Sequence, residues 1–296
     1  TDDSAIVTVN LTINPVAPAT TPKLANGFVT GVSTDSWTTI TPGPTYTSMV
    51  VVATPNYDSG SVPLVVRVQN VTSNSFQVSL ARTSGTGTAT ATVYWMAVEE
   101  GVYTEAEHGV KMEAHTFTST VTDENNSWSG QVRSYSQSYS TAVVLGQVMT
   151  TNDSDWSVFW SRGSGRNRPP NGTLRVGKHV GEDPDTTRAN ETIGYIIIEA
   201  GSGSIEGTPY LAAVGADSIR GVTNSPPYNY SISGPGGATV AVVSQTGMDG
   251  NNGGWALLYG TSPVSDSSLA LAIDEDQSND TERKHTTEQV AYIVFG

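Results

Sequence analysis

The sequence reads Val93-Tyr94-Trp95-Met96-Ala97-Val98-Glu99 at the end of its first third. Similar apolar strands occur at Gly194-Tyr195-Ile196-Ile197-Ile198-Glu199 and Ala291-Tyr292-Ile293-Val294-Phe295-Gly296, so the tyrosines recur about every 100 residues. Each of these closing strands follows an opening strand and an Asn/Asp-rich loop, and the opening strands are Val50-Val51-Val52-Ala53-Thr54, Ala142-Val143-Val144-Leu145-Gly146 and Val240-Ala241-Val242-Val243-Ser244. The recurrence predicts three similar β units in series.

Composition supports an all-β protein. Only 14% of the 296 residues are charged, and the abundance of Ser, Thr and Gly favours strands and turns over long helices. There is no cysteine, which excludes disulfides, thiol nucleophiles and thiolate metal sites. The net charge of −14 argues against a nucleic-acid partner, and no apolar run approaches the length that spans a membrane.

Strand and turn spacing predicts tandem antiparallel β-sandwiches in about three repeats, preceded by an isolated strand. We expect the repeats at 24–100, 101–200 and 201–296, after an N-terminal strand and Pro-rich linker at 1–23. Residues 5–14 alternate between apolar and polar, with Val7, Val9, Leu11 and Ile13 on one face. This pattern is typical of a half-buried strand that could be donated to a neighbouring subunit.

The first repeat resembles the H-type lectin domain. The resemblance lies in Gly27-Phe28-Val29, Asp35-Ser36-Trp37, Val50-Val51-Val52-Ala53-Thr54-Pro55, the stretch 67–78 and Val93-Tyr94-Trp95-Met96-Ala97-Val98, which occur in the order of that family. It implies a six-stranded sandwich, and because the matched positions are mostly core or turn positions it implies fold more than sugar binding. The intersubunit disulfide of that family cannot form here, because the chain has no cysteine. The N-terminal strand with Asn14-Pro15-Val16 is similar to the end of a cadherin-like surface repeat.

Short polar residues follow each opening strand. Such residues favour turns, since their side chains bond to nearby backbone, and turn formation is the simpler interpretation. The alternative is a rim that binds sugar hydroxyls beside aromatic rings. The candidate sugar-binding residues are Asn56, Asp58, Asp153, Asp155, Trp156, Asp249, Asn251 and Trp255.

An acidic loop in the third repeat resembles the start of a calcium loop. Asp274, Asp276 and Asp280 place oxygens at alternate positions, so calcium is a candidate cofactor. The loop lacks the glycine expected at the sixth position, and His285 stands where a calcium loop has a bidentate glutamate. A solvated loop is the alternative interpretation.

The chain contains eight N-glycosylation sequons, more than the abundance of Ser and Thr gives by chance. They predict an extracellular glycoprotein, although accidental sequons in a Ser/Thr-rich chain are the alternative. All but the first fall in predicted loops. The sequons begin at Asn10, Asn70, Asn125, Asn152, Asn171, Asn190, Asn229 and Asn279.

Common catalytic motifs are missing from the sequence. We therefore expect a non-enzymatic, extracellular, glycosylated surface protein, a structural subunit of a fibre that pairs with copies of itself by β-strand addition. One alternative is a carbohydrate-binding adhesin module whose repeats gain by avidity. Another is an accessory region of a polysaccharide-active enzyme.

Overall fold

The computed structural model describes residues 21–170 and 172–296. Strands make up 48% and helix 1% of the structure, which confirms the predicted all-β fold. The single helix of this part of the chain is α1 (Glu105–His108), so no helix there is long and apolar enough to cross a membrane. The predicted donor strand at 5–14 lies outside the described residues.

Three groups of strands follow one another along the chain. The first group is β1 (Leu24–Ser33), β2 (Thr38–Ile40), β3 (Met49–Tyr57), β4 (Leu64–Gln69), β5 (Phe76–Arg82) and β6 (Thr90–Glu99). The second is β7 (Gly101–Tyr103), β8 (Met112–Ser119), β9 (Thr122–Asp123), β10 (Gln131–Arg133), β11 (Ala142–Val148), β12 (Val158–Arg162), β13 (Leu174–His179) and β14 (Glu191–Glu199). The third is β15 (Gly201–Ile205), β16 (Thr208–Val214), β17 (Tyr228–Ser231), β18 (Val240–Gln245), β19 (Trp255–Tyr259), β20 (Ser268–Asp274) and β21 (Val290–Phe295).

Each group contains a sandwich with two layers of three core strands, and in the second and third groups β7, β9 and β15 extend these layers at β8, β13 and β16. In the first repeat β1, β6 and β3 form one layer, and β2, β5 and β4 form the other. The corresponding layers are β8-β14-β11 with β10-β13-β12, and β16-β21-β18 with β17-β20-β19. Between the layers of the first repeat, Val51 and Trp95 pack with Leu64 and Phe76. Each repeat therefore has its own first strand and its own six-stranded sandwich within the described residues.

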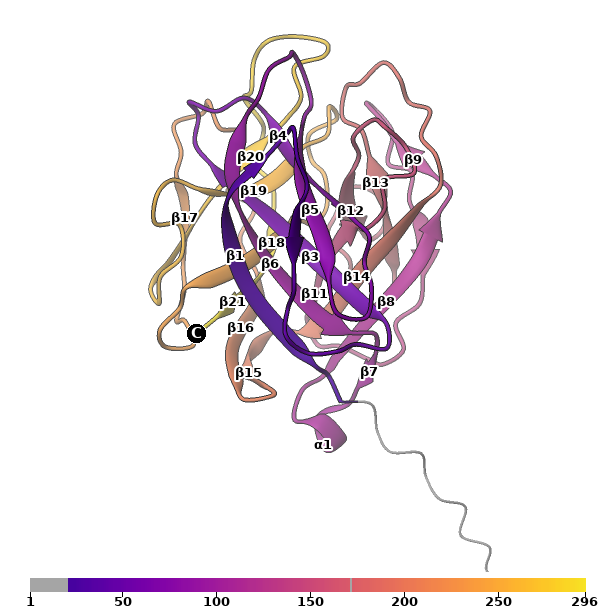
Figure 1. Cartoon of the computed structure of the whole chain (residues 1–296), viewed down its shortest axis with the longest axis vertical. Coiled ribbons are helices and arrows are strands. Elements are labelled where there is room, and N and C mark those ends of the chain that lie inside the picture. The colour runs from indigo at the N-terminus through magenta and orange to yellow at the C-terminus, as the bar shows by residue number, and fades with distance from the viewer. Residues whose placement is uncertain (1–20, 171) are drawn as a thin grey trace, which may run out of the picture.

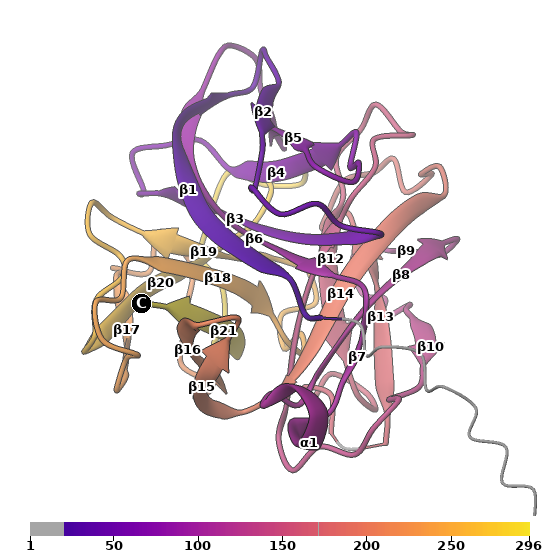
Figure 2. The same cartoon turned by 60° about the horizontal axis from the view of Figure 1, so that its bottom comes forward.

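The three sandwiches are arranged in a ring around a common centre (Figure 1 and Figure 2). The opening strands β3, β11 and β18 contact one another there. Each also contacts the closing strand of another repeat: β3 contacts β14, β11 contacts β21, and β18 contacts β6. A hydrogen bond also joins the third repeat to the first: the Val243 amide donates to Thr54 Oγ1 over 2.9 Å. The repeats thus share a central core in addition to their own.

The shared core explains why the opening and closing strands are apolar at consecutive positions. Val51 faces the first sandwich, whereas Val52 belongs to the central core with Met96, Leu145 and Ile196. A strand buried on both faces gives a continuous apolar run in place of alternation.

The sequence alignment that matches Tyr94 with Tyr195 and Tyr292 is wrong by one residue, because Trp95 is the structural equivalent in the first repeat. Trp95 faces the interior of its sandwich, as Tyr195 does in the second repeat and Tyr292, which contacts Tyr230, does in the third. Tyr94 faces the central core instead. A shift of one position moves a strand residue to the opposite face of the sheet, and both residues are aromatic, so sequence spacing could not distinguish them.

Glutamates at the ends of two closing strands hold the chain that leads into the opening strands. Glu99 accepts hydrogen bonds from the amides of Thr47 and Ser48, at 2.8–2.9 Å. Glu199 does the same for residues 140 and 141. Burial opposes ionisation of Glu99, but these amides and Lys23 outweigh it and lower its pKa. Charge-assisted bonds of this kind anchor the residues just before these two opening strands to the ends of their closing strands.

Candidate functional site

The loops after the opening strands lie at the junctions between repeats. Arg67 of β4 donates to the carbonyls of Asp153 and Ser154, in the loop after β11. In the same way Arg166 donates to the Asp249 carbonyl, in the loop after β18. At the third junction, β19 pairs in parallel with the end of β3. Joining neighbouring repeats is therefore one established role of these loops.

Several of the candidate sugar-binding residues have another role in the structure. Trp156 and Trp255 are each only 5% exposed and pack edge to face, with ring centroids 5.8 Å apart, so neither presents a ring to a sugar. Asn56 lies within β3 and not in a loop. Asp58 accepts a hydrogen bond from the amide two residues on, and so does Asp153, as the turn interpretation predicts. The exposed candidates are Asp58, Asp155, Asp249 and Asn251.

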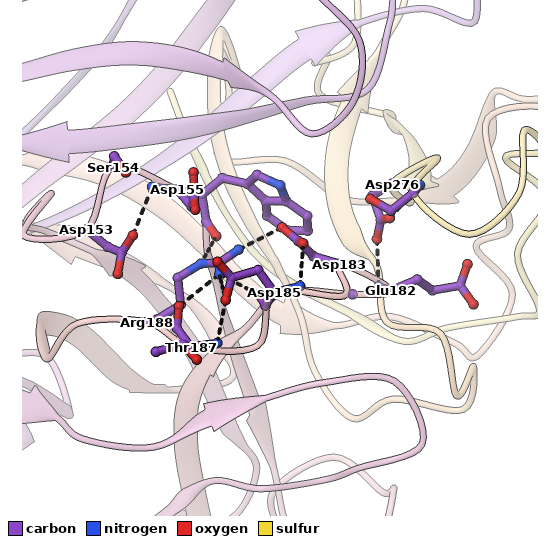
Figure 3. A network of polar contacts seen from close by, with 12 residues as sticks. Asp153, Ser154, Asp155, Glu182, Asp183, Asp185, Thr187, Arg188 and Asp276 are labelled. Carbon is purple, nitrogen blue, oxygen red and sulfur yellow. Dashed lines mark hydrogen bonds and ion pairs between the residues drawn. The ribbon is translucent and has the colours of Figure 1, made fainter.

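The acidic loop of the second repeat is organised by a buried arginine (Figure 3). Arg188 donates to the Asp183 carboxylate over 2.8 Å and to the Trp156 carbonyl over 3.0 Å. It also donates to the carbonyls of Asp185 and Thr187. The guanidinium thus connects the loop before β14 with the loop after β11. The guanidinium is paired within this network, and the network holds the two loops together.

The acidic loop of the third repeat begins with a buried ion pair. Asp274 receives two hydrogen bonds from Arg283, at 2.8 and 2.5 Å, and a third from the Tyr57 hydroxyl at 2.7 Å. The Trp255 indole in turn donates to the Tyr57 oxygen over 3.0 Å. Burial raises the pKa of Asp274, against the effect of Arg283. This chain of polar groups joins the first repeat to the third.

The other two predicted calcium ligands are also occupied by the protein. Asp276 accepts from the amides of Glu182 and Ser278 at 2.8 and 2.9 Å, and Asp280 accepts from the Glu282 amide at 2.9 Å. Across residues 21–170 and 172–296, no three His, Asp or Glu side chains are grouped to hold a metal ion. The alternating oxygens form turns and inter-repeat contacts, so the calcium-loop interpretation has no support in this geometry.

A surface groove that sequence reasoning missed lies where the first repeat meets the loop after β11. It encloses about 480 Å³ and is lined by Asp35, Trp37, Arg67, Arg82 and Ser154, among others. Trp37 is 37% exposed, which is unusual for a side chain of this size. We call this feature the Trp37 groove. The signal was present in Asp35-Ser36-Trp37, but a tryptophan next to a predicted strand is more often buried.

The polar groups of the Trp37 groove are held in place. The Asp35 carboxylate accepts hydrogen bonds from the hydroxyls of Thr34 and Thr88. Arg82 Nε donates to the Ser84 carbonyl over 3.1 Å, and Arg67 is held by its two carbonyl acceptors. Burial lowers the pKa of Arg67, although nearby acids counter the shift. The groove therefore places the partly exposed Trp37 side chain with fixed donors and a fixed acceptor.

A second cavity lies on the axis of the ring and is too small for a sugar. It measures about 40 Å³ and is lined by residues of all three repeats, among them Pro55, Gln147 and Gln245. The Gln245 side chain is 2% exposed, and neither of its amide atoms has a hydrogen-bond partner among residues 21–170 and 172–296. A cavity of this size suits water molecules, which satisfy buried amides of this kind.

Most sequons lie on the surface. Asn70, Asn152, Asn190, Asn229 and Asn279 are exposed, whereas Asn125 is half-buried. Asn229 lies in strand β17 and not in a loop, contrary to the prediction. The sequons at Asn10 and Asn171 fall outside the described residues.

Comparison with family models, with curated proteins and with solved structures found no match for this chain. The Trp37 groove and the edges of the sheets are therefore interpreted from their own geometry and chemistry.

Proposed function

We propose that the chain is a non-enzymatic, extracellular surface protein that binds carbohydrate in the Trp37 groove. The observation that carries this proposal is the exposed Trp37 ring beside Asp35 and Arg67 in a groove of about 480 Å³. The apolar faces of sugar rings pack on aromatic faces, while sugar hydroxyls bond to fixed donors and acceptors. Sites for small ligands combine these features in grooves of about this volume.

The lining of the groove favours binding over hydrolysis. Most glycoside hydrolases place two carboxylates on either side of the scissile bond. Asp35 is the single carboxylate among the described residues that line the groove. Its two oxygens already accept hydrogen bonds from two threonine hydroxyls, which suits a hydrogen-bond acceptor for a ligand. This groove therefore gives no support to the alternative that the chain is part of a polysaccharide-active enzyme.

Glycan-array screening followed by calorimetry tests the proposal. We expect Trp37→Ala to weaken binding of the best glycan by at least about tenfold, which corresponds to about 1.4 kcal/mol. Val132→Ala is the control, because Val132 is an exposed apolar residue that does not line the groove. Equal loss in both variants, unchanged affinity in Trp37→Ala, or no glycan binding at all would contradict the proposal.

A second candidate function is assembly into a fibre through the N-terminal strand. The observation that favours it is that each sandwich of the described ring already has its own first strand, which is β1, β8 or β16. No sandwich needs residues 1–20 to complete its two layers. The apolar face of Val7, Val9, Leu11 and Ile13 is then available to a neighbouring copy.

Electron microscopy of truncated protein tests the assembly function. We expect deletion of residues 1–16 to leave a folded ring that no longer forms filaments. Val9→Asp should have nearly the same effect, since a carboxylate placed on the buried face loses hydration without a partner. Thr8→Asp, on the polar face, is the control and should assemble. Filaments from the truncated chain would refute strand donation.

A further inference from the structure

The first strands of the three repeats differ in how their outer edges are covered. β8 lies between β14 and β7, which pairs Tyr103 with Met112. β16 lies between β21 and β15, which pairs Ser202 with Leu211. β1 pairs with β6 on one side, and within residues 21–170 and 172–296 no strand pairs with its other side.

An uncovered edge of this kind can accept a further strand. Residues Leu24–Val29 pair with β6 in regular register, so their outward N–H and C=O groups form a regular edge. The register is interrupted after Val29, where Gly31 has φ 69°. A bulge twists the edge, so an added strand can pair regularly with about six residues of β1, from Leu24 to Val29. The edge also has an apolar neighbour, because Phe28 is 52% exposed and lies 5.3 Å from the Tyr94 ring.

We infer that the outer edge of β1 accepts residues 5–14 of a second copy of the chain as an added β-strand. This inference rests on the assembly function, and it names the acceptor. The segment matches the edge in chemistry, because its apolar face can cover Phe28 while its backbone completes the hydrogen bonding. In the other two repeats the covering strand comes from the residues just before the first strand, and residues 5–14 hold that place in the sequence before β1.

The linker favours a second copy over the same chain. Pro15, Pro18 and Pro22 separate the segment from β1. A composition rich in proline favours an extended, semi-rigid linker, which disfavours folding the segment back onto its own β1. In contrast, β15 and β16 are joined by the two residues Glu206 and Gly207 in a tight turn. A chain reversal between residues 14 and 24 would have to bend this stiff linker.

Disulfide trapping between two distinguishable copies tests the inference, and the absence of native cysteine makes every link assignable. One copy carries only Asn26→Cys in β1, on the same face of the sheet as Phe28, and the other carries only Val7→Cys, Val9→Cys or Leu11→Cys, on the donor face that covers Phe28. We expect at least one pair to give a linked dimer under mild oxidation. Ser202→Cys on the exposed strand β15 is the control acceptor and should give little product. Circular dichroism and thermal melting check that each variant is folded.

The remaining outcomes separate the two proposals. If a chain carrying both cysteines links only within itself, or if Ser202→Cys links as well as Asn26→Cys, the β1 acceptor is wrong. If filaments form and need residues 1–16 but no link to β1 is found, assembly stands and the acceptor is wrong. If the full chain forms no filaments and no linked dimers, the assembly function itself fails.

Discussion

Replacing Arg283 with methionine is expected to lower the free energy of unfolding by about 3–5 kcal/mol. The variant would leave Asp274, which is fully buried, without the guanidinium that now donates two hydrogen bonds to it. Removing one member of a buried ion pair leaves an uncompensated charge in a medium of low dielectric constant. Because the pair also holds Tyr57 of β3, the junction between the first and third repeats should weaken as well. Urea unfolding followed by tryptophan fluorescence measures the loss.

Two further variants sharpen this experiment. Arg220→Met removes an exposed arginine and should change stability by less than about 0.5 kcal/mol. The double variant Asp274→Leu with Arg283→Met should recover part of the loss, because a buried pair replaced by apolar residues no longer contains an unpaired charge. A single Arg283→Met variant as stable as the natural chain would show that the pair contributes nothing to the junction.

The advantage of Glu275→Gln over the natural chain is expected to grow with pH. Glu275 is 4% exposed, and burial, with the nearby acids Glu282 and Asp274, raises its pKa to about 9. A carboxyl whose pKa is higher in the folded state contributes stability that is fully present below its unfolded pKa and is lost as pH rises through the folded value. The neutral amide of the variant does not titrate and fills the same space, so the difference isolates this group.

Melting temperatures from pH 4 to pH 9 measure the effect. The two proteins should melt at similar temperatures near pH 4, and the variant should melt several degrees higher near pH 9. Glu124→Gln is the control, since Glu124 is exposed, and its difference from the natural chain should stay constant. A Glu275→Gln curve parallel to that of the natural chain would mean that Glu275 is ionised in the folded state. Glu288, whose pKa burial raises to about 7, contributes in the same direction in both proteins.

The strands of the first repeat were largely predictable from local pattern. The predicted opening strand Val50–Thr54 lies within β3, and the predicted closing strand Val93–Glu99 lies within β6. Turn chemistry was predictable for the same reason, as Asp58 and Asp153 show. These features depend on a residue and its near neighbours in the chain, and the sequence reports such neighbours directly.

The functional candidates were less predictable, because exposure depends on packing. Trp156 and Trp255 were candidates for a sugar-binding rim but pack against each other in the interior, whereas Trp37 was not a candidate and lines a groove. In each case a residue that determines whether the tryptophan is buried or exposed belongs to a different repeat or loop. Sequence periodicity shows which face of a strand is apolar, but it does not show what covers that face.

The sequence by itself determined that the chain is all-β, that three similar units recur, and that their opening and closing strands are buried. Only the tertiary structure decided that the units close into a ring, that Trp95 and not Tyr94 fills the first sandwich, and that no strand of the described residues pairs with the outer edge of β1. The physical reason is the range of the interactions. The ring is held by contacts such as Tyr57 with Asp274, which join residues more than 200 positions apart and leave no periodic signal in the sequence.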